Sequence, residues 1–344
     1  MLVAVYHNNR DIRIEDVPKP EIGPEEILLK VMASGICGTD VVEWYRLPKA
    51  PRVLGHEATG IIEEAGKNVT KYKVGDRVFV SHHVPCNDCC YCNNDAHTAC
   101  ETLHTTNYYP GGFSQYIRVP KINIQNGGVY KLPDDMSYEE GTFIEPLACA
   151  VRGQRLAGIQ KGDTVLIIGS GMAGILHIQL TKLKEPKAVI VADINPERVK
   201  LAKKFGADHV IDAKDDLPKQ LQKVNNGQLA DKVIVCTGAE KAALTALECV
   251  DRGGTILFFA VPDPTVKIPI PITQFWRNET TIKTSYGAAP RDLEEALHVL
   301  AQKKINVLDM ITHRFDIREA AEGFRLVAEA GKSLKVIIES NRTE

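Results

Sequence analysis

The sequence predicts an α/β protein of two domains, one built on a doubly wound parallel sheet and the other rich in short β-strands. Three observations support this prediction. The chain has 344 residues, more than one hydrophobic core usually organises. From Lys161 onward, runs rich in Val and Ile alternate with stretches of helical period. Before about residue 146 the strands are short and helical period is scarce. We expect residues 1–146 and 288–344 to form one domain and residues 147–287 the other.

The first domain is expected to be a small all-β barrel, because its strand-like runs alternate in polarity and are separated by Gly and Pro. These runs are ILLKVMA, GIIEEAG, DRVFV and YIRVP. The C-terminal stretch contains two segments of helical period, RDLEEALHVLAQKK and AAEGFRLVAEA, and ends in the strand-like KVIIES. We expect this stretch to return to the first domain.

The second domain is expected to be a Rossmann domain, because helical stretches separate most of its strands, as in a parallel sheet with helical crossovers. The predicted strands are TVLIIG (164–169), AVIVAD (188–193), DHVIDA (208–213), KVIVCTG (232–238), TILFFA (255–260) and TTIKTSYG (280–287). The last connection, residues 261–276, carries four prolines and is expected to be an extended, edge-like segment rather than a helix.

Composition points to small-molecule partners. A formal net charge of −2 gives no electrostatic reason to expect a nucleic acid or an anionic membrane as partner.

The N-terminal stretch lacks the apolar segment of a signal peptide, and no run is long enough to span a bilayer, so we expect a cytoplasmic protein. Nine cysteines in a reducing cytosol favour metal ligation over disulfides.

Five of these cysteines lie within residues 85–100, PCNDCCYCNNDAHTAC. The spacing CxxCxxCxxxxxxxC joins Cys86, Cys89, Cys92 and Cys100, which suits a tetrahedral zinc ion bound by four thiolates. Such a site leaves no open coordination position and is therefore structural. A register with Cys90 in place of Cys89 remains open.

A second candidate set is Cys37, His56 and Glu57, in the stretches SGICGTD and GHEATG. One thiolate, one imidazole and one carboxylate can occupy three corners of a zinc tetrahedron and leave the fourth for water or substrate. Taken singly, such a cysteine or histidine is more often structural.

The stretch GSGMAG follows the strand TVLII and opens a helical pattern, which is the context of a dinucleotide-binding loop. The residues predicted to bind cofactor there are Gly169, Gly171, Met172, Ala173 and Gly174. Asp193 ends the next strand, where a carboxylate can accept hydrogen bonds from the adenosine ribose and repel a 2′-phosphate, so NAD(H) is favoured over NADP(H). Arg198, five residues later, leaves that preference open.

Together these motifs resemble the zinc-containing medium-chain dehydrogenase/reductase family, in its polyol (sorbitol) and threonine dehydrogenase branch. The resemblance covers essentially the full chain and rests also on GGFSQYIRVP, EPLAC, ITHRF and LKVII. It implies a GroES-like catalytic domain, two zinc ions per subunit (one catalytic, one structural), NAD(H) and a homodimer or homotetramer.

The resemblance also implies roles for single residues. Cys37, His56 and Glu57 would surround the catalytic zinc, with Glu145 of EPLAC as ligand or near neighbour, and Thr39 would take the substrate proton. Residues 235–238, with Thr237, and 259–261, with Val261, match loops that line the cofactor. Val42 stands where many members have a relay histidine, so water or another group would finish the proton relay. A second carboxylate would make the zinc site negative, so we expect Glu145 to exchange with water or substrate.

The reaction expected from this resemblance is the reversible NAD⁺-linked oxidation of a secondary alcohol, such as a polyol or diol, to its ketone. L-Threonine or a sugar phosphate on the same machinery is an alternative. Either would need an additional ionic partner in the protein, and the sequence shows no evident candidate. A non-catalytic redox sensor that binds zinc and NAD is a remote alternative.

Overall fold

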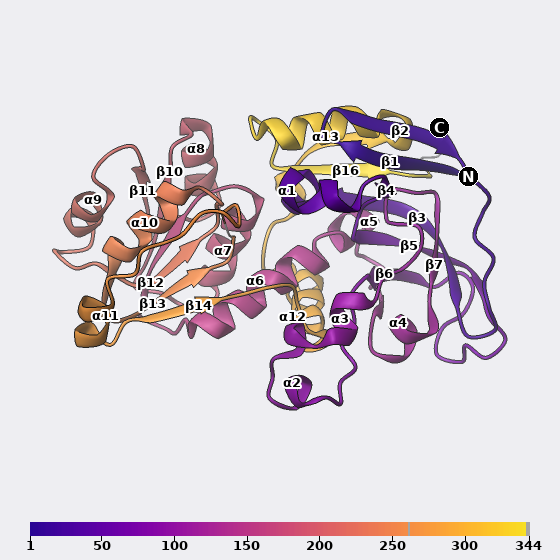
Figure 1. Ribbon diagram of the computed structural model, residues 1–344, viewed down its shortest axis with the longest axis horizontal. Helices are drawn as coiled ribbons and strands as arrows, with labels where there is room; N and C mark the ends of the chain where they lie inside the picture. The colour runs from indigo at the N-terminus through magenta and orange to yellow at the C-terminus, as the bar shows by residue number, and fades with distance from the viewer. Residues whose placement is uncertain (261, 342–344) are drawn as a thin grey trace. The chain divides into compact units, whose positions relative to one another are not determined.

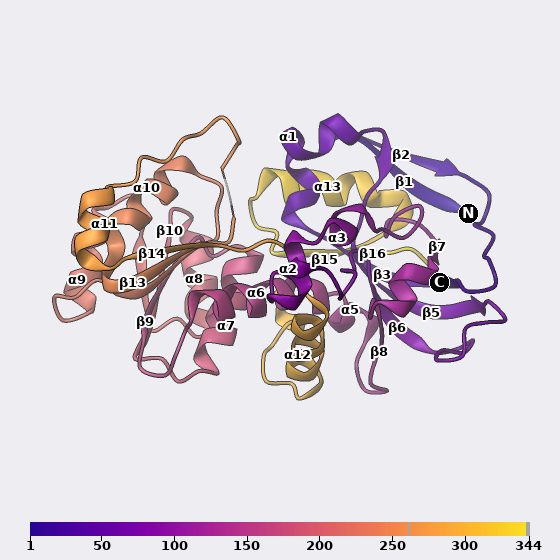
Figure 2. The same ribbon diagram turned by 60° about the horizontal axis from the view of Figure 1, so that its bottom comes forward.

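A computed structural model of the chain describes residues 1–260 and 262–341 (Figures 1 and 2). The chain divides into two compact units, of which the first comprises Met1–Ala148, Ala288–Lys303 and Val307–Glu344, and the second Cys149–Gly287 and Lys304–Asn306. The predicted α/β class is confirmed. The division into domains at 1–146 with 288–344, and 147–287, stays a prediction. Within the described ranges, no helix is both long and apolar enough to cross a membrane.

The first unit is built on two sheets. The larger sheet runs in the order β15-β16-β3-β5-β6-β8, with β7 also paired to β3, and the smaller in the order β2-β1-β4. The strands are β1 (Leu2–Asn8), β2 (Asp11–Asp16), β3 (Ile27–Ile36), β4 (Arg52–Val53), β5 (Glu57–Ala65), β6 (Arg77–Ser81), β7 (Tyr116–Val119), β8 (Val129–Lys131), β15 (Ile311–Asp316) and β16 (Lys335–Glu339). The C-terminal strand β16 thus pairs antiparallel with β3 from the start of the chain.

Alternate side chains of β3 contribute to the core of this unit. Ile27, Leu29 and Val31 point to the same side and join one buried cluster with residues of β5, β6 and β7. At the other end of β3, Ile36 belongs to a second cluster that includes Phe324. Because both ends of β3 are packed, the loop that follows Ile36 starts from a fixed position.

The helices of the first unit are mostly short. They are η1 (Gly38–Val41), α1 (Glu43–Arg46), η2 (Leu47–Lys49), α2 (Cys90–Asn93), η3 (His97–Ala99), α3 (Glu101–Thr105), α4 (Lys121–Gln125), α5 (Tyr138–Gly141), α6 (Ile144–Ala157, which continues into the second unit), α12 (Pro290–Ala301), η4 (Leu308–Met310), η5 (Ile317–Glu319) and α13 (Ala320–Glu329). The two C-terminal helices predicted from sequence are α12 and α13. Asp292 accepts a hydrogen bond from the backbone N–H of Ala289 and so caps the start of α12.

The second unit contains one parallel sheet of six strands in the order β11-β10-β9-β12-β13-β14, visible in Figure 1. The strands are β9 (Thr164–Ile168), β10 (Ala188–Asp193), β11 (His209–Asp212), β12 (Ala230–Val235), β13 (Val250–Phe258) and β14 (Thr281–Thr284). All six predicted strands are present, and the order reverses between β9 and β12, as in a doubly wound Rossmann sheet. β13 starts five residues earlier than predicted.

Helices pack on this sheet, and alternate residues of its strands contact them. The helices are α7 (Met172–Lys182), α8 (Pro196–Lys204), α9 (Leu217–Val224), α10 (Glu240–Cys249) and α11 (Ile272–Asn278). Leu166 and Ile168 of β9 belong to the buried cluster that includes Leu221 of α9 and Ala246 of α10. Ile167, between them on β9, points toward α7, where a Cβ added at Gly174 would lie 3.7 Å from its side chain.

The prediction for the proline-rich connection was wrong at its end. Residues 262–271 form no regular element, but α11 begins at Ile272, directly after the last proline. Pro271 takes the N-cap position, where a missing backbone N–H costs no helical hydrogen bond. The last proline therefore marks the start of a helix, and all four prolines lie outside the edge strand β14.

Candidate active site

The four-cysteine lobe brings together the set chosen by spacing. The sulfurs of Cys86, Cys89, Cys92 and Cys100 lie within 4.8 Å of one another, whereas Cys90 is exposed and outside this group. The Cys86–Cys100, Cys89–Cys92 and Cys86–Cys92 sulfur pairs are 3.5, 3.6 and 3.9 Å apart. Zn–S bonds of about 2.3 Å in a tetrahedron place the sulfurs about 3.8 Å apart, so the donor set fits zinc. The structure thus favours the register with Cys89.

The lobe has little core apart from these thiols. Its buried cluster consists of Cys92, Cys100 and Leu103, with Cys86 and Cys89 packed against it. Burial alone would raise the pKa of Cys100, but the backbone N–H groups of Cys86 and Leu103 donate to its sulfur and lower the pKa to about 6. A thiolate held in this way is prepared to bind a cation.

We predict that Cys92→Ser will lose one of two zinc ions per chain and make the lobe sensitive to protease, because a lobe with so small a core depends on its metal. Metal analysis and limited proteolysis measure both effects. Cys90→Ser is the matched control and should retain both zinc ions. Zinc loss in Cys90→Ser with retention in Cys89→Ser would contradict the register.

The second candidate set also converges. Cys37 follows the end of β3, and Glu57 begins β5, where it pairs with Gly35 of β3. Because the two strands are antiparallel neighbours, the end of β3 lies beside His56 and Glu57. One ligand atom each from Cys37, His56 and Glu57 lies within 4.8 Å of the others. We refer to these three residues as the catalytic cluster.

Asp40 orients the imidazole of His56. Its carboxylate is fully buried, with Oδ1 3.4 Å from His56 Nδ1 and 3.0 Å from an Arg46 nitrogen, and Oδ2 accepts a hydrogen bond of 3.1 Å from the Cys37 N–H. Burial alone would lower the pKa of His56, but Asp40 and Cys37 raise it well above the usual value. With Nδ1 directed at Asp40, Nε2 is left for a metal ion, whose binding would displace a proton.

Glu57 forms a buried ion pair with Lys335 of β16. Both side chains have no exposed surface, and Lys335 Nζ contacts Glu57 Oε2. The other carboxylate oxygen, Oε1, is buried and has no hydrogen-bond partner among the described residues. An unpartnered buried carboxylate oxygen is costly unless a cation satisfies it. Together with the thiolate and the imidazole, it fits a zinc ion.

Thr39 lies at the edge of the same cluster. Its hydroxyl donates to the sulfur of Cys37 over 3.3 Å and accepts from Arg46 over 3.3 Å. Arg46 also donates to the Thr39 carbonyl oxygen over 2.9 Å. The side chain of Arg46 thus fixes the position of this hydroxyl.

Glu145 is the second residue of α6 and is almost fully buried. Across residues 1–260 and 262–341, its carboxylate is outside the group of ligand atoms that the catalytic cluster forms. Burial, followed by the charges of Asp40, Glu145 and Glu57, raises the pKa of Tyr108 well above its usual value. Glu145 is therefore near enough to act on the same tyrosine as Glu57, and its role as a ligand stays a prediction.

Two further histidines, His82 and His83, lie beside the catalytic cluster. The rings of His82 and His56 have centroids 5.0 Å apart, and those of His82 and His83 are 3.8 Å apart. Burial, with neighbouring positive charges, lowers the pKa of His82 well below the usual value and that of His83 to about 4. Both rings are therefore neutral at pH 7.

The glycine loop has the geometry that its sequence predicts. Gly169 follows β9 with a φ of +95°, a value that side chains disfavour. Gly171 is the N-cap of α7, whose first residues are Met172 and Ala173. A Cβ at Gly174 would lie 2.0 Å from the Gly169 carbonyl oxygen, so only glycine lets the helix approach the strand this closely. The free N–H groups of the first turn of α7 suit a phosphate.

Asp193 ends β10 beside this loop. Its Oδ2 accepts from the Ser170 N–H over 2.7 Å and from the Ser170 hydroxyl over 3.0 Å, while Oδ1 accepts from the Asn195 N–H over 2.8 Å. Arg198 of α8 reaches the loop too, because a Cβ at Gly171 would lie 3.0 Å from its guanidinium. Thr237 follows β12, and a Cβ at Gly169 would lie 3.3 Å from it. Val261 lies outside the described residues.

Sequence reasoning missed Asp40, Arg46 and Lys335. Asp40 and Arg46 follow Cys37 closely in the sequence. An acidic and a basic residue so near a predicted metal ligand were the signal that could have indicated them. Lys335 is separated from Glu57 by 278 positions and had no local signal.

Comparisons with known proteins cover both units. The family described as "Zinc-binding dehydrogenase" matches residues 173–302, and the "Alcohol dehydrogenase GroES-like domain" matches residues 23–134. Sorbitol dehydrogenase of Gallus gallus is 31% identical, over 100% of this chain and 97% of that protein.

Solved structures are similar over the same extent. Galactitol-1-phosphate dehydrogenase from Escherichia coli matches with a TM-score of 0.87 and 26% identity, covering 98% of this chain and 100% of that one. 2R,3R-butanediol dehydrogenase from Bacillus subtilis matches with a TM-score of 0.85 and 25% identity, covering 99% of each chain.

Proposed function

Because the chain belongs to the zinc-binding dehydrogenase family, with a GroES-like domain and a Rossmann sheet, we propose that it interconverts a secondary alcohol and its ketone with NAD(H) at the catalytic cluster. The buried, unpartnered Glu57 Oε1 beside a thiolate and an imidazole carries this proposal, because the three donors leave one corner of a tetrahedron open. A zinc ion bound there would supply Lewis acidity towards the alcohol oxygen.

The chain's own residues have separate tasks in this reaction. Thr39 takes the proton of the substrate hydroxyl, and Arg46 holds the threonine oxygen in position. Asp40 fixes the ring of His56, and Lys335 compensates the charge of Glu57. Val42 has no titratable group, so the proton passes on to water or to another side chain.

A screen of secondary alcohols, polyols, diols and L-threonine tests the proposal, with NADH absorbance as the readout. We expect turnover of polyols or diols, as the names of the sorbitol and butanediol dehydrogenase relatives suggest. Turnover should be lost after metal removal and restored by zinc. Undiminished activity in protein shown to contain no metal would contradict the proposal.

NAD(H) is proposed as cofactor because Asp193 ends β10 next to the glycine loop. We predict that Asp193→Asn will lower the ratio of kcat/KM for NAD⁺ to that for NADP⁺ by about tenfold, since the negative charge that repels a 2′-phosphate is removed. Asparagine keeps one oxygen that can accept from Ser170 and loses the acceptor of the Asn195 N–H, so the contact with the glycine loop should be preserved. An unchanged ratio would assign cofactor choice to another residue, with Arg198 as the first candidate.

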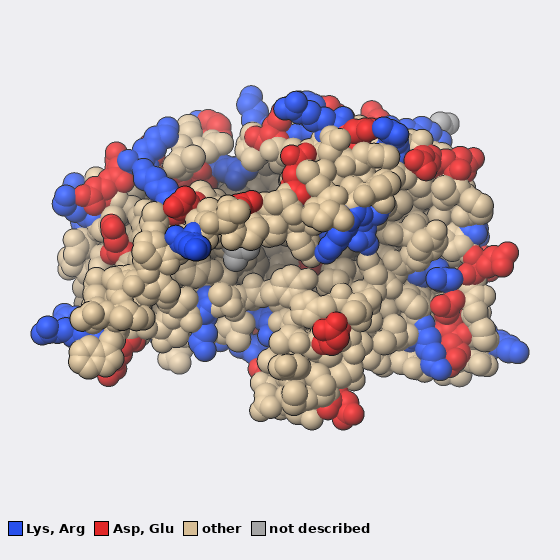
Figure 3. Space-filling view, viewed as in Figure 1, with Lys and Arg blue, Asp and Glu red and all other residues tan. Residues whose placement is uncertain are grey.

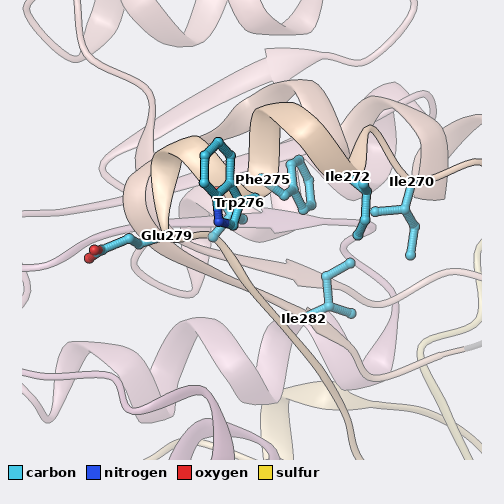
Figure 4. A pocket seen from close by; sticks show the side chains of 7 residues that line it. Ile270, Ile272, Phe275, Trp276, Glu279 and Ile282 are labelled. Carbon is cyan, nitrogen blue, oxygen red and sulfur yellow. The ribbon is translucent and has the colours of Figure 1, made fainter.

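A homo-oligomer formed through the outer edge of β14 is also proposed. This edge strand contains no proline and is flanked by an open apolar groove whose lining includes Ile270, Ile272 and Trp276 (Figure 4). Trp276 is 80% exposed and Ile272 69% exposed. An unpaired strand edge can pair with the same edge of a second copy about a twofold axis, and such pairing would cover the exposed apolar patch beside it.

Trp276→Arg is predicted to shift the protein towards monomer, because it places charge in that patch. Sedimentation velocity measures the change, and Trp44→Arg, a substitution at the other tryptophan, is the control. A Trp276→Arg variant with the assembly state of the unmodified protein would rule out this edge.

We propose a reducing compartment such as the cytoplasm as the location, because the four lobe cysteines must stay reduced to bind metal.

A further inference from the structure

Three cations follow Thr39 closely in the sequence of the first unit. They are Arg46 at the end of α1, Lys49 at the end of η2 and Arg52 in β4, and we call them the basic cluster. Arg46 lies 3.3 Å from the Thr39 hydroxyl. Arg46 and Lys49 lie over the same Tyr45 ring, 4.9 and 4.4 Å from its centroid. In Figure 3 a group of Lys or Arg side chains lies near the position of β4 in Figure 1, and Asp or Glu side chains lie near the position of α1.

The acidic groups of this region do not balance these charges. Asp40 is shared between Arg46 and His56, and Glu43 accepts a hydrogen bond from the Asn9 N–H. In the described ranges, neither Lys49 nor Arg52 has a carboxylate within ion-pair distance, and the guanidinium of Arg52 has no hydrogen-bond partner.

Arg52 is the member whose presence the fold does not explain. It is only partly exposed, and burial, followed by the charge of Arg46, lowers its pKa. A partly buried cation next to another cation is unfavourable unless an anion joins them. Arg46 already has Thr39 and Asp40 as partners, and Lys49 lies against Tyr45, so Arg52 is the cation left for a ligand.

The basic cluster adjoins the catalytic cluster through Arg46. One carboxylate oxygen of Asp40 lies 3.0 Å from an Arg46 nitrogen and 3.4 Å from His56 Nδ1. A group bound at the basic cluster can therefore belong to the same substrate as a hydroxyl placed at Thr39.

We propose that the basic cluster binds an anionic group of the substrate, so that the preferred alcohol carries a phosphate or a carboxylate besides the hydroxyl that is oxidised. Arg52 makes the principal contact and Lys49 an auxiliary one. A guanidinium binds both groups through paired N–H donors, so the two share one recognition chemistry. This inference rests on the proposed dehydrogenase function and names the substrate class of the same site. It supplies the ionic partner that was not evident in the sequence.

Matched pairs of neutral and charged alcohols test the inference in the zinc-loaded enzyme. Sorbitol against sorbitol 6-phosphate probes a phosphate, and 2,3-butanediol against 3-hydroxybutyrate probes a carboxylate. We expect kcat/KM to be higher for the charged member of at least one pair, and which pair responds identifies the anion. The KM of that charged member should rise with ionic strength, whereas the KM of the neutral member should not.

Arg52→Gln should lower the charged-to-neutral ratio of kcat/KM at least about tenfold, mainly through KM for the charged member. Arg52→Lys should retain part of the preference, which shows that the positive charge and not the local fold is responsible. Arg13→Gln is the control, because Arg13 is an exposed arginine of the same unit paired with Asp11. The charged-to-neutral ratio of kcat/KM of Arg13→Gln should equal that of the unmodified enzyme.

The outcomes separate this inference from the proposed function. Neutral alcohols favoured in both pairs, or an unchanged ratio in Arg52→Gln, would overturn the inference and leave the dehydrogenase function standing. Failure of all four probes, together with the wider alcohol screen, would reject both. Weaker NADH binding by Arg52→Gln, with the ratio unchanged, would assign the arginine to the cofactor's phosphates and overturn the inference as well.

Discussion

Cys37→Ser and His56→Ala are expected to lower turnover by at least about a thousandfold, because each removes one of three donors from the catalytic cluster. NADH binding should remain measurable in both variants, since the glycine loop belongs to the second unit. Steady-state rates, metal content and NADH fluorescence titration measure the three effects. One zinc ion per chain should remain, held by the lobe cysteines.

Cys90→Ser provides the control for thiol loss, because Cys90 is exposed and outside both clusters. Its activity should equal that of the unmodified protein. A Cys37→Ser enzyme that keeps its rate would remove the metal from the mechanism, and loss of NADH binding in the same variant would indicate general misfolding.

Lys335→Met is expected to destabilise the metal-free protein by about 3–5 kcal/mol, because it leaves the buried carboxylate of Glu57 without a compensating charge. The zinc-loaded protein should lose much less stability, since a cation at Glu57 Oε1 compensates the charge of that carboxylate. Urea unfolding followed by Trp44 fluorescence reports on the first unit when Trp276, the only other tryptophan, is replaced by Phe.

The double variant Glu57→Gln with Lys335→Met is the matched control, because it removes both charges. Its metal-free stability should recover most of the loss, as buried ion pairs are often replaceable by neutral groups of similar volume. Equal destabilisation of single and double variants would show that packing around Lys335 matters, not its charge.

Local patterns in the sequence were enough to predict the elements and most of the candidate site. The cysteine spacing and the glycine loop are each contained in a short segment, so their geometry follows from residues close together. The prediction of an extended, edge-like segment at residues 261–276 failed because it depended on residues outside the pattern itself. Four prolines indicated extended chain, but the capping role of Pro271 depends on the residues after it.

Lys335 could not be found by such patterns. It is a lysine in a strand-like run, and nothing local distinguishes it from a solvated charge. It also changes the charge count at the metal site. With its positive charge included, a second carboxylate from Glu145 would leave the zinc site neutral rather than negative, so charge alone does not exclude Glu145 as a lasting ligand.

The Glu57–Lys335 contact has a further consequence during protein synthesis. Strand β16 pairs with β3 and brings in the lysine, which is translated 278 positions after Glu57. Until then Glu57 has no internal counter-charge in the nascent chain. The thiolate-rich lobe, whose four ligands lie close together in sequence, can acquire its ion early, whereas the catalytic centre matures only once the last strand has docked.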